Sequence, residues 1–243
     1  MRFIKHNKNG FAATVEICEA NGATKIAGAA SSTSANKLVY ATGGFTAAVD
    51  VGDAVFNSTD TTHAYVTAVD SDTQLSISAD IFTSGENFTV QGEFTHNITD
   101  TDMGSTDAAN LDPVANPVVA GDNTYEKYQT LHITAMGGSS AIDNLKIWRT
   151  SALGGSAVHV TNARETSYAR KAYVAPIATN STQGTQTMPT SEPTGSNLGI
   201  DGSLSGSRTA AGHSDFLIHQ IQTDAGDVAG STSTMNYQYD ETA

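Results

Sequence analysis

The three residue types of a hydrolytic triad stand side by side at His213-Ser214-Asp215. A triad needs its three side chains to converge on one point, whereas consecutive residues of a strand point to opposite faces. The sequence therefore predicts no nucleophilic relay at these positions. No other combination of residues predicts catalytic chemistry, and we expect a protein that is not an enzyme.

Histidines that could bind a metal are spread along the chain without the short spacing typical of a zinc site: they are His63, His96, His132, His159 and His219. We interpret them as residues of strand faces or edges. Cys18, the single cysteine, cannot form a disulfide within the chain. It lies in an expected strand without a histidine or lysine to activate it, so the pattern predicts an inert, packed thiol.

A short acidic run resembles the start of a calcium-binding loop, with Asp100, Asp102, Gly104 and Asp107 in a D-x-D-x-G arrangement. The glutamate that ends an EF-hand loop is missing. Asp100, Asp102 and Asp107 are the only metal candidates that the pattern offers, and the alternative is a polar turn. We expect no cofactor.

Aromatic residues offer a further kind of site, because exposed rings stack on sugars. The candidates are Trp148, Tyr168, Tyr173, Tyr237 and Tyr239. Trp148 ends the apolar segment 142–148, which predicts that its ring lies in the core. Carbohydrate binding thus stays open mainly through the tyrosines.

The charge balance excludes several classes of partner. The 243 residues contain 12 Lys and Arg against 25 Asp and Glu, which gives a net charge of −13. So negative a chain repels phosphate backbones and anionic lipids, and we expect no direct nucleic-acid partner and no membrane partner. No apolar run is long enough to span a bilayer, and the first residues do not resemble a signal peptide, so synthesis and assembly in the cytosol are expected.

The charge is unevenly distributed. Residues 1–36 carry 4 basic and 2 acidic residues, residues 37–92 carry 1 and 7, and residues 93–243 carry 7 and 16. Arg2, Lys5 and Lys8 make the start of the chain basic, which predicts an arm that meets an acidic neighbour. A solvated basic terminus is the alternative.

Apolar residues recur with a period of two and nowhere with a helical period, so the sequence predicts an all-β fold. Residues 1–36 are expected to form an N-terminal strand at 11–18 and an extended arm or linker. Short strands separated by Gly, Asp and Ser turns predict a small β-barrel or meander at 37–92.

Residues 93–243 are expected to form a larger antiparallel β-sandwich. Its predicted strands are 94–98, 125–135, 142–148, 157–160, 216–222 and 235–239. The segment 179–208 has no strand pattern and contains Pro189 and Pro193, which predicts a long loop that contacts a partner.

Several segments resemble structural proteins from the virions of tailed bacteriophages. They include Val51-Gly52-Asp53-Ala54-Val55-Phe56-Asn57, Asp70-Ser71-Asp72-Thr73-Gln74-Leu75, Ile142-Asp143-Asn144-Leu145-Lys146-Ile147-Trp148, Gly212-His213-Ser214-Asp215-Phe216 and Tyr237-Gln238-Tyr239-Asp240-Glu241. In size and acidity the chain is most similar to capsid decoration, or cement, proteins. The resemblance implies a homo-oligomer on the capsid exterior that binds the major capsid protein and sister copies and stabilises the shell.

Within this resemblance, the basic residues Arg2, Lys5 and Lys8 and the prolines Pro189 and Pro193 are the expected partner-binding positions. The alternatives are a neck or tail component of the particle and a module on the virion that binds host glycans. Copy number per particle separates decoration from a neck or tail location. Unchanged adsorption after mutation of Tyr168 and Tyr173 would count against the glycan-binding module.

Overall fold

The computed structural model describes residues 1–8, 10–20, 24–60, 62–106, 111–165, 186–196, 208–214, 216–228 and 233–243. It is nearly all β, which confirms the predicted fold class. The strands are β1 (Arg2–Lys8), β2 (Thr14–Ala20), β3 (Thr24–Ala29), β4 (Lys37–Val39), β5 (Asp53–Asn57), β6 (Thr62–Ser71), β7 (Gln74–Ile77), β8 (Asn87–Thr95), β9 (Lys127–Ala135), β10 (Ala141–Arg149), β11 (Val158–Glu165), β12 (Gln186–Thr187), β13 (Gly212–His213), β14 (Phe216–Gln222) and β15 (Thr234–Thr242).

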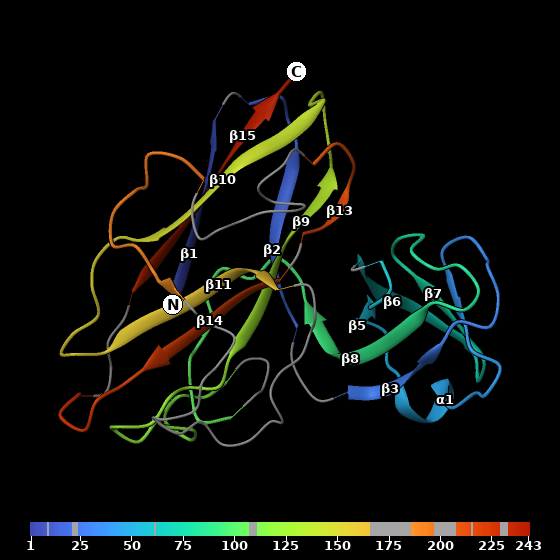
Figure 1. Cartoon of the computed structure of the whole chain (residues 1–243), viewed down its shortest axis with the longest axis horizontal. Coiled ribbons are helices and arrows are strands. Elements are labelled where there is room, and N and C mark those ends of the chain that lie inside the picture. The colour runs from blue at the N-terminus through green and yellow to red at the C-terminus, as the bar shows by residue number, and fades with distance from the viewer. Residues whose placement is uncertain are drawn as a thin grey trace.

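Two sheets pack face to face around the main core (Figure 1). The smaller sheet has the order β1-β15-β10, and the larger one contains β12-β11-β14-β9-β2 in its sandwich half. Phe3, Ile147 and Tyr237 from the smaller sheet and Ile17 and Leu131 from the larger sheet belong to one buried cluster. Each of these strands presents alternate residues to the core, as the period of two requires.

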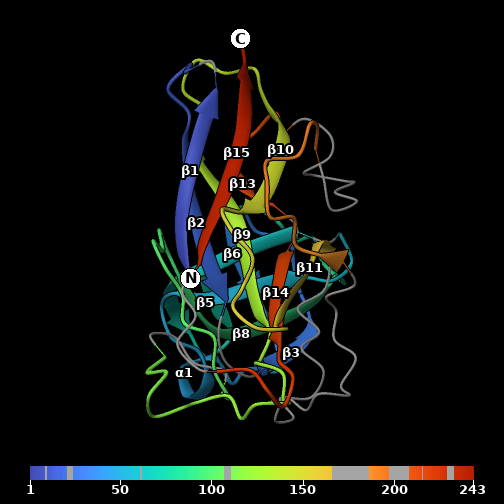
Figure 2. The same cartoon turned by 90° about the vertical axis from the view of Figure 1, so that its left-hand side faces the viewer.

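The first and last strands of the chain lie side by side. β1 and β15 pair in parallel, with Arg2 opposite Thr234 and Lys8 opposite Asp240 (Figure 2). β2 lies between β9 and β8 in the larger sheet, and β3 pairs with β8. β2 lies where a strand is expected, whereas the pairing of β1 corrects the expectation of an extended N-terminal arm, because Phe3 gives β1 a face to bury in the main core.

A smaller module lies beside the sandwich, to its right in Figure 1. Strands β3, β8, β5, β6, β7 and β4 follow one another around a curled sheet. A bridge between Ser32 and Val39 brings β4 close to the chain that leaves β3. The sheet encloses its own core, with Phe45, Leu75 and Phe88 among its buried residues.

The module and the sandwich share one continuous strand. The sequence predicts a strand that begins at residue 94, whereas β8 runs without interruption from Asn87 to Thr95. Its first part pairs with β5 and β3, and its end pairs with β2, so β8 crosses the expected boundary at residue 92. Gln91, expected in a break between strands, is buried opposite Ala54.

The single described helix, α1 (Phe45–Ala48), buries Phe45 in the core of the module. Among the described residues, no helix combines the length and apolar character needed to cross a lipid bilayer. One glycine of the module has a clear packing role. A Cβ atom on Gly28 would lie 2.6 Å from Cε2 of Tyr40, so the ring of Tyr40 reaches Phe88 only because residue 28 has no side chain.

Candidate functional site

Four side chains of the types that bind metals converge on one face of β2. Glu16, Cys18, His96 and His132 each offer one ligand atom, and these atoms all lie within 4.8 Å of one another. No other group of three or more histidine, cysteine or acidic side chains among the described residues lies close enough to hold a metal ion.

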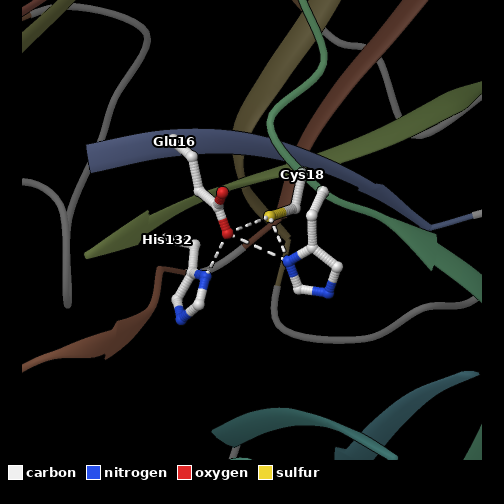
Figure 3. Close-up of side chains that lie close together, drawn as sticks. Glu16, Cys18 and His132 are labelled. Carbon is white, nitrogen blue, oxygen red and sulfur yellow. Dashed lines mark hydrogen bonds and ion pairs between the residues drawn. The ribbon is translucent and has the colours of Figure 1, made fainter. Parts of the chain in front are cut away.

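Strand geometry places three of the four residues. Glu16 and Cys18 are two positions apart on β2, so they share the face opposite the one on which Val15 and Ile17 enter the main core. His132 on β9 is the direct register partner of Glu16. Figure 3 shows the side chains of Glu16 and Cys18 leaving β2 on the same side and His132 meeting the Glu16 carboxylate.

His96 comes from the opposite edge of β2, where β8 pairs with it. It directly follows the end of β8, where Thr95 pairs with Glu19. Asn97 then adopts a left-handed backbone conformation with φ 49°, and the N–H of Ile98 donates to the carbonyl of Ile17 at 2.9 Å. This turn keeps the chain beside β2 and brings His96 next to Cys18.

One carboxylate oxygen connects the group. Oε1 of Glu16 lies 2.6 Å from Nδ1 of His132, 2.9 Å from Nδ1 of His96 and 3.5 Å from Sγ of Cys18. Cys18 Sγ is also 3.4 Å from Nδ1 of His96. The cysteine is fully buried, while the His96 side chain keeps 30% of its surface exposed, so the group is reached from solvent on the His96 side.

The electrostatics keep the residues in defined protonation states. Burial, together with the nearby Glu16 charge, raises the pKa of the Cys18 thiol. Burial also disfavours ionisation of Glu16, but hydrogen bonds from His96 and His132 outweigh this effect and lower the pKa of Glu16. The pKa of His132 is lowered by burial despite the Glu16 carboxylate. At neutral pH the group therefore contains a thiol, a carboxylate and a neutral imidazole at His132.

Aromatic rings surround the group. Tyr65 of β6 meets His96 edge to face with 4.3 Å between ring centroids, so the module contributes one wall. His213 of β13 stacks on His132, with centroids 4.0 Å apart and 2° between the planes. Nδ1 of His213 is in turn 2.8 Å from Oγ1 of Thr130. The orientation of the His132 ring is thus fixed by packing as well as by Glu16.

This arrangement corrects one interpretation made from the sequence, because Cys18 does have a histidine neighbour, His96. His132 lies on β9 and His96 directly follows β8, as expected for histidines of strand faces or edges, and the fold brings both beside Glu16 and Cys18. The partners are 78 and 116 positions apart along the chain. The Glu-x-Cys alternation on a strand is the one local signal of the site, and nothing in the sequence pattern identifies which distant histidines face it.

The predicted calcium ligands do not form a described site. Asp107 lies outside the described residues. Asp100 and Asp102 are exposed, and neither belongs to the group of potential metal ligands. Asp100 instead forms an isolated bridge with Arg2 beside β1.

The expected partner-binding residues have different environments. Arg2 is exposed, whereas Nζ of Lys5 donates to the carbonyl of Val15 at 2.7 Å, so Lys5 contacts β2. Lys8 is opposite Asp240 in the β1–β15 register. The three basic residues thus belong to a paired strand within the fold.

Part of the expected loop 179–208 is packed against the sandwich. β12 pairs with β11, Met188 enters the main core, and the carbonyl of Pro189 accepts a hydrogen bond from the N–H of Arg149 at 2.8 Å. Pro189 and Pro193 are half-buried. Residues 179–185 and 197–207 lie outside the described residues.

The described residues of the predicted triad and of the predicted sugar site are hydrogen-bonded or buried within the fold. Ser214 accepts a hydrogen bond from the backbone N–H of Leu131, while Asp215 lies outside the described residues. Trp148, Tyr237 and Tyr239 are buried, so their rings offer no sugar platform. Tyr168 and Tyr173 lie outside the described residues.

A buried polar network crosses the sandwich core. Nε2 of His159 is 3.0 Å from Nδ1 of His219, and Nε2 of His219 is 3.0 Å from the hydroxyl of Tyr237. That hydroxyl donates to Oε1 of Gln129, whose amide donates to Glu19, both at 2.9 Å. Burial lowers the pKa of His219 to about 3, so the ring is neutral. The network links β11, β14, β15, β9 and β2.

A hollow of about 310 Å³ lies between segments that are far apart in the sequence. Its lining combines apolar residues, among them Met1, Met103, Leu153 and Val228, with polar ones that include Asp102, Thr124 and Asp227. Val228 is 81% exposed, and the neighbouring loop carries Val114 and Val119 with 86% and 67% exposed.

No protein-family model, curated protein or solved structure matches this chain.

Proposed function

We propose that this chain is a non-enzymatic structural protein of a tailed-phage virion that binds the outer surface of the capsid as a decoration protein. Its partners are the major capsid protein and sister copies. The observation that carries the proposal is the hollow lined by the exposed Val228, with the exposed Val114 and Val119 next in sequence to its lining residues Pro113 and Val118. Its link to phage virions is the segmental resemblance described from the sequence.

The hollow has the character of a protein-binding surface. Clustered, highly exposed apolar side chains on a folded protein mark sites where another protein covers them. The hollow brings together residues that lie far apart in the sequence, such as Met103, Leu153 and Val228. The chain as a whole has only 15% charged residues, so few ions lose water when a wide surface is covered.

Copy number tests the location on the particle. Virions of the phage that encodes the chain are purified, and the stained band is compared with that of the major capsid protein. Hundreds of copies per particle are expected for a decoration protein, whereas about six to twelve indicate a neck or tail ring. Either the low number or the absence of the chain from virions overturns the proposal.

Substitutions in the hollow test the surface. Val119→Asp and Val228→Asp are expected to reduce binding to empty, expanded capsids by at least about tenfold, which corresponds to about 1.4 kcal/mol. Val51→Asp is the matched control, because Val51 is 64% exposed in a turn of the module. Equal binding by all three variants and the unchanged chain means that the hollow is not the capsid-binding surface.

A further inference from the structure

We propose that Glu16, Cys18, His96 and His132 bind one zinc ion, which joins β2, β9 and the segment that follows β8. The proposal does not depend on the role of the chain in a virion. It is based on the residue types, the distances between their ligand atoms and the balance of charge.

The four ligand atoms lie within 4.8 Å of one another, and a tetrahedral zinc site requires about 3.3–3.6 Å between each pair. The widest pair therefore closes by about 1 Å when the ion binds. Zinc lies about 2.3 Å from cysteine sulfur and about 2.0–2.1 Å from histidine nitrogen, which places sulfur and nitrogen about 3.5 Å apart around the ion. Sγ of Cys18 and Nδ1 of His96 are 3.4 Å apart. The contacts of Glu16 with the two histidines, at 2.6 and 2.9 Å, are hydrogen-bond distances. They need to lengthen by less than about 1 Å to accommodate the ion.

The charges favour a divalent ion. The Cys18 thiol loses its proton to solvent when the ion binds, and the resulting thiolate and the Glu16 carboxylate together carry two negative charges. His96 and His132 bind as neutral imidazoles, so the complex with Zn²⁺ has no net charge. A neutral complex suits a site whose cysteine is fully buried. A thiolate with two imidazoles favours zinc over calcium or magnesium, which bind oxygen ligands.

The surroundings support the ligands. The backbone N–H of Asn97 hydrogen-bonds to the sulfur of Cys18 and therefore stabilises its thiolate form. His213 stacks on His132 and limits rotation of that ring. Such outer contacts orient metal ligands and strengthen binding. The partly exposed His96 side chain leaves a route by which the ion reaches the site from solvent.

The position of the site defines its role. β2 precedes the module, His96 follows the last strand of the module, and His132 lies in the sandwich. An ion held by all four residues fixes the point at which the chain leaves the module and returns to the sandwich. Tyr65 of the module contacts His96 at this point, so zinc is expected to restrict movement between the two parts.

Cobalt provides a direct test. Full-length protein is treated with a chelator, and Co²⁺ is added in steps. We expect visible absorption typical of tetrahedral cobalt and a near-ultraviolet band from thiolate-to-cobalt charge transfer, both saturating at one ion per chain and both lost when Zn²⁺ is added. Because Cys18 is the single cysteine, the charge-transfer band identifies it as a ligand without any mutation. Absence of that band at one equivalent of Co²⁺ overturns the proposal.

Variants at Cys18, His96 and His132 test whether these side chains bind the zinc ion. Cys18→Ser, His96→Gln and His132→Gln are expected to weaken Zn²⁺ binding by at least about 100-fold in competition with a chromophoric chelator. Glu192→Gln is the control, because Glu192 is an acidic side chain paired with Lys146 away from the group. Circular dichroism confirms that each variant is folded. Unchanged zinc affinity in folded Cys18→Ser or His96→Gln contradicts the proposed ligand set.

Discussion

Glu16 on β2 and His132 on β9 are direct register partners, and Oε1 of Glu16 lies 2.6 Å from Nδ1 of His132. The same oxygen is 2.9 Å from Nδ1 of His96, which lies at the opposite edge of β2. Without a metal, this carboxylate therefore links three neighbouring segments of the larger sheet. Its removal affects stability as well as metal binding.

Replacement of Glu16 by Gln is expected to lower the free energy of unfolding of the metal-free protein by about 1–3 kcal/mol at pH 7. The reason is that hydrogen bonds to a charged acceptor stabilise more than those to a neutral amide, and two histidines depend on this acceptor. Urea denaturation measures the change. Glu192→Gln, at a carboxylate whose side chain is 47% exposed, is expected to change stability by less than about 0.5 kcal/mol. Equal effects of both variants contradict the linking role of Glu16.

Acid is expected to destabilise the fold below about pH 6.5 through its buried histidines. Burial, with a smaller effect of Arg208, lowers the pKa of His63 to about 3, and burial alone lowers that of His219 to about 3. Between pH 6.5 and 3 both histidines are protonated in the unfolded chain but stay neutral in the folded chain. The free energy of unfolding therefore falls as the pH falls. Each histidine contributes a slope of up to about 1.4 kcal/mol per pH unit.

Replacement of His63 by Gln isolates one of these contributions. The slope of unfolding free energy against pH between 5 and 6 is expected to decrease by about 1.4 kcal/mol per pH unit, whatever the change in stability at pH 7. Urea denaturation at several pH values gives the slope. A slope equal to that of the unchanged protein means that His63 becomes protonated in the folded state.

Loss of one hydroxyl is expected to disrupt the buried network of the sandwich. Tyr237→Phe leaves His219 and Gln129 without their contacts to that hydroxyl, and unsatisfied buried polar groups cost about 1–3 kcal/mol. Tyr239→Phe is the matched control on the same strand, because no hydrogen bond of its hydroxyl occurs among the described residues. Thermal and urea unfolding are expected to show a clear loss for Tyr237→Phe alone.

The first strand is expected to be essential for stability. Phe3 is 8% exposed and packs edge to face on Tyr237, so Phe3→Ala should cost about 3–5 kcal/mol. Arg2→Ala, at an exposed position of the same strand, should cost less than about 0.5 kcal/mol. A free arm, by contrast, predicts that Phe3→Ala leaves the unfolding free energy unchanged.

Local pattern was sufficient to predict where most strands lie. The alternation of Met235, Tyr237 and Tyr239 with polar residues correctly predicts the existence of β15, and these three residues are the ones that it places in the main apolar core. Trp148 is buried as the apolar segment around it indicates. Turn residues were less reliable, because Gln91 and Gly92 resemble a break and yet lie within β8.

The pairing of the strands was not visible in the sequence. The basic residues near the start of the chain suggest an arm, but β1 pairs with the last strand of the chain, over 230 positions away in register. A pattern of alternation shows that a strand has a face to bury and does not show which strand lies beside it. The contacts between β1 and β15 depend on the folded sandwich as a whole.

The sequence by itself determined the all-β fold class, the negative charge and the alternating faces of β2, since these depend on composition and on neighbouring residues. Tertiary structure decided which residues meet Glu16 and Cys18. The register of β2 with β9 selects His132, and the turn at Asn97 places His96 beside the thiol. A site formed by residues from three segments exists only when long-range hydrogen bonding fixes their register, and that register is a property of the folded chain.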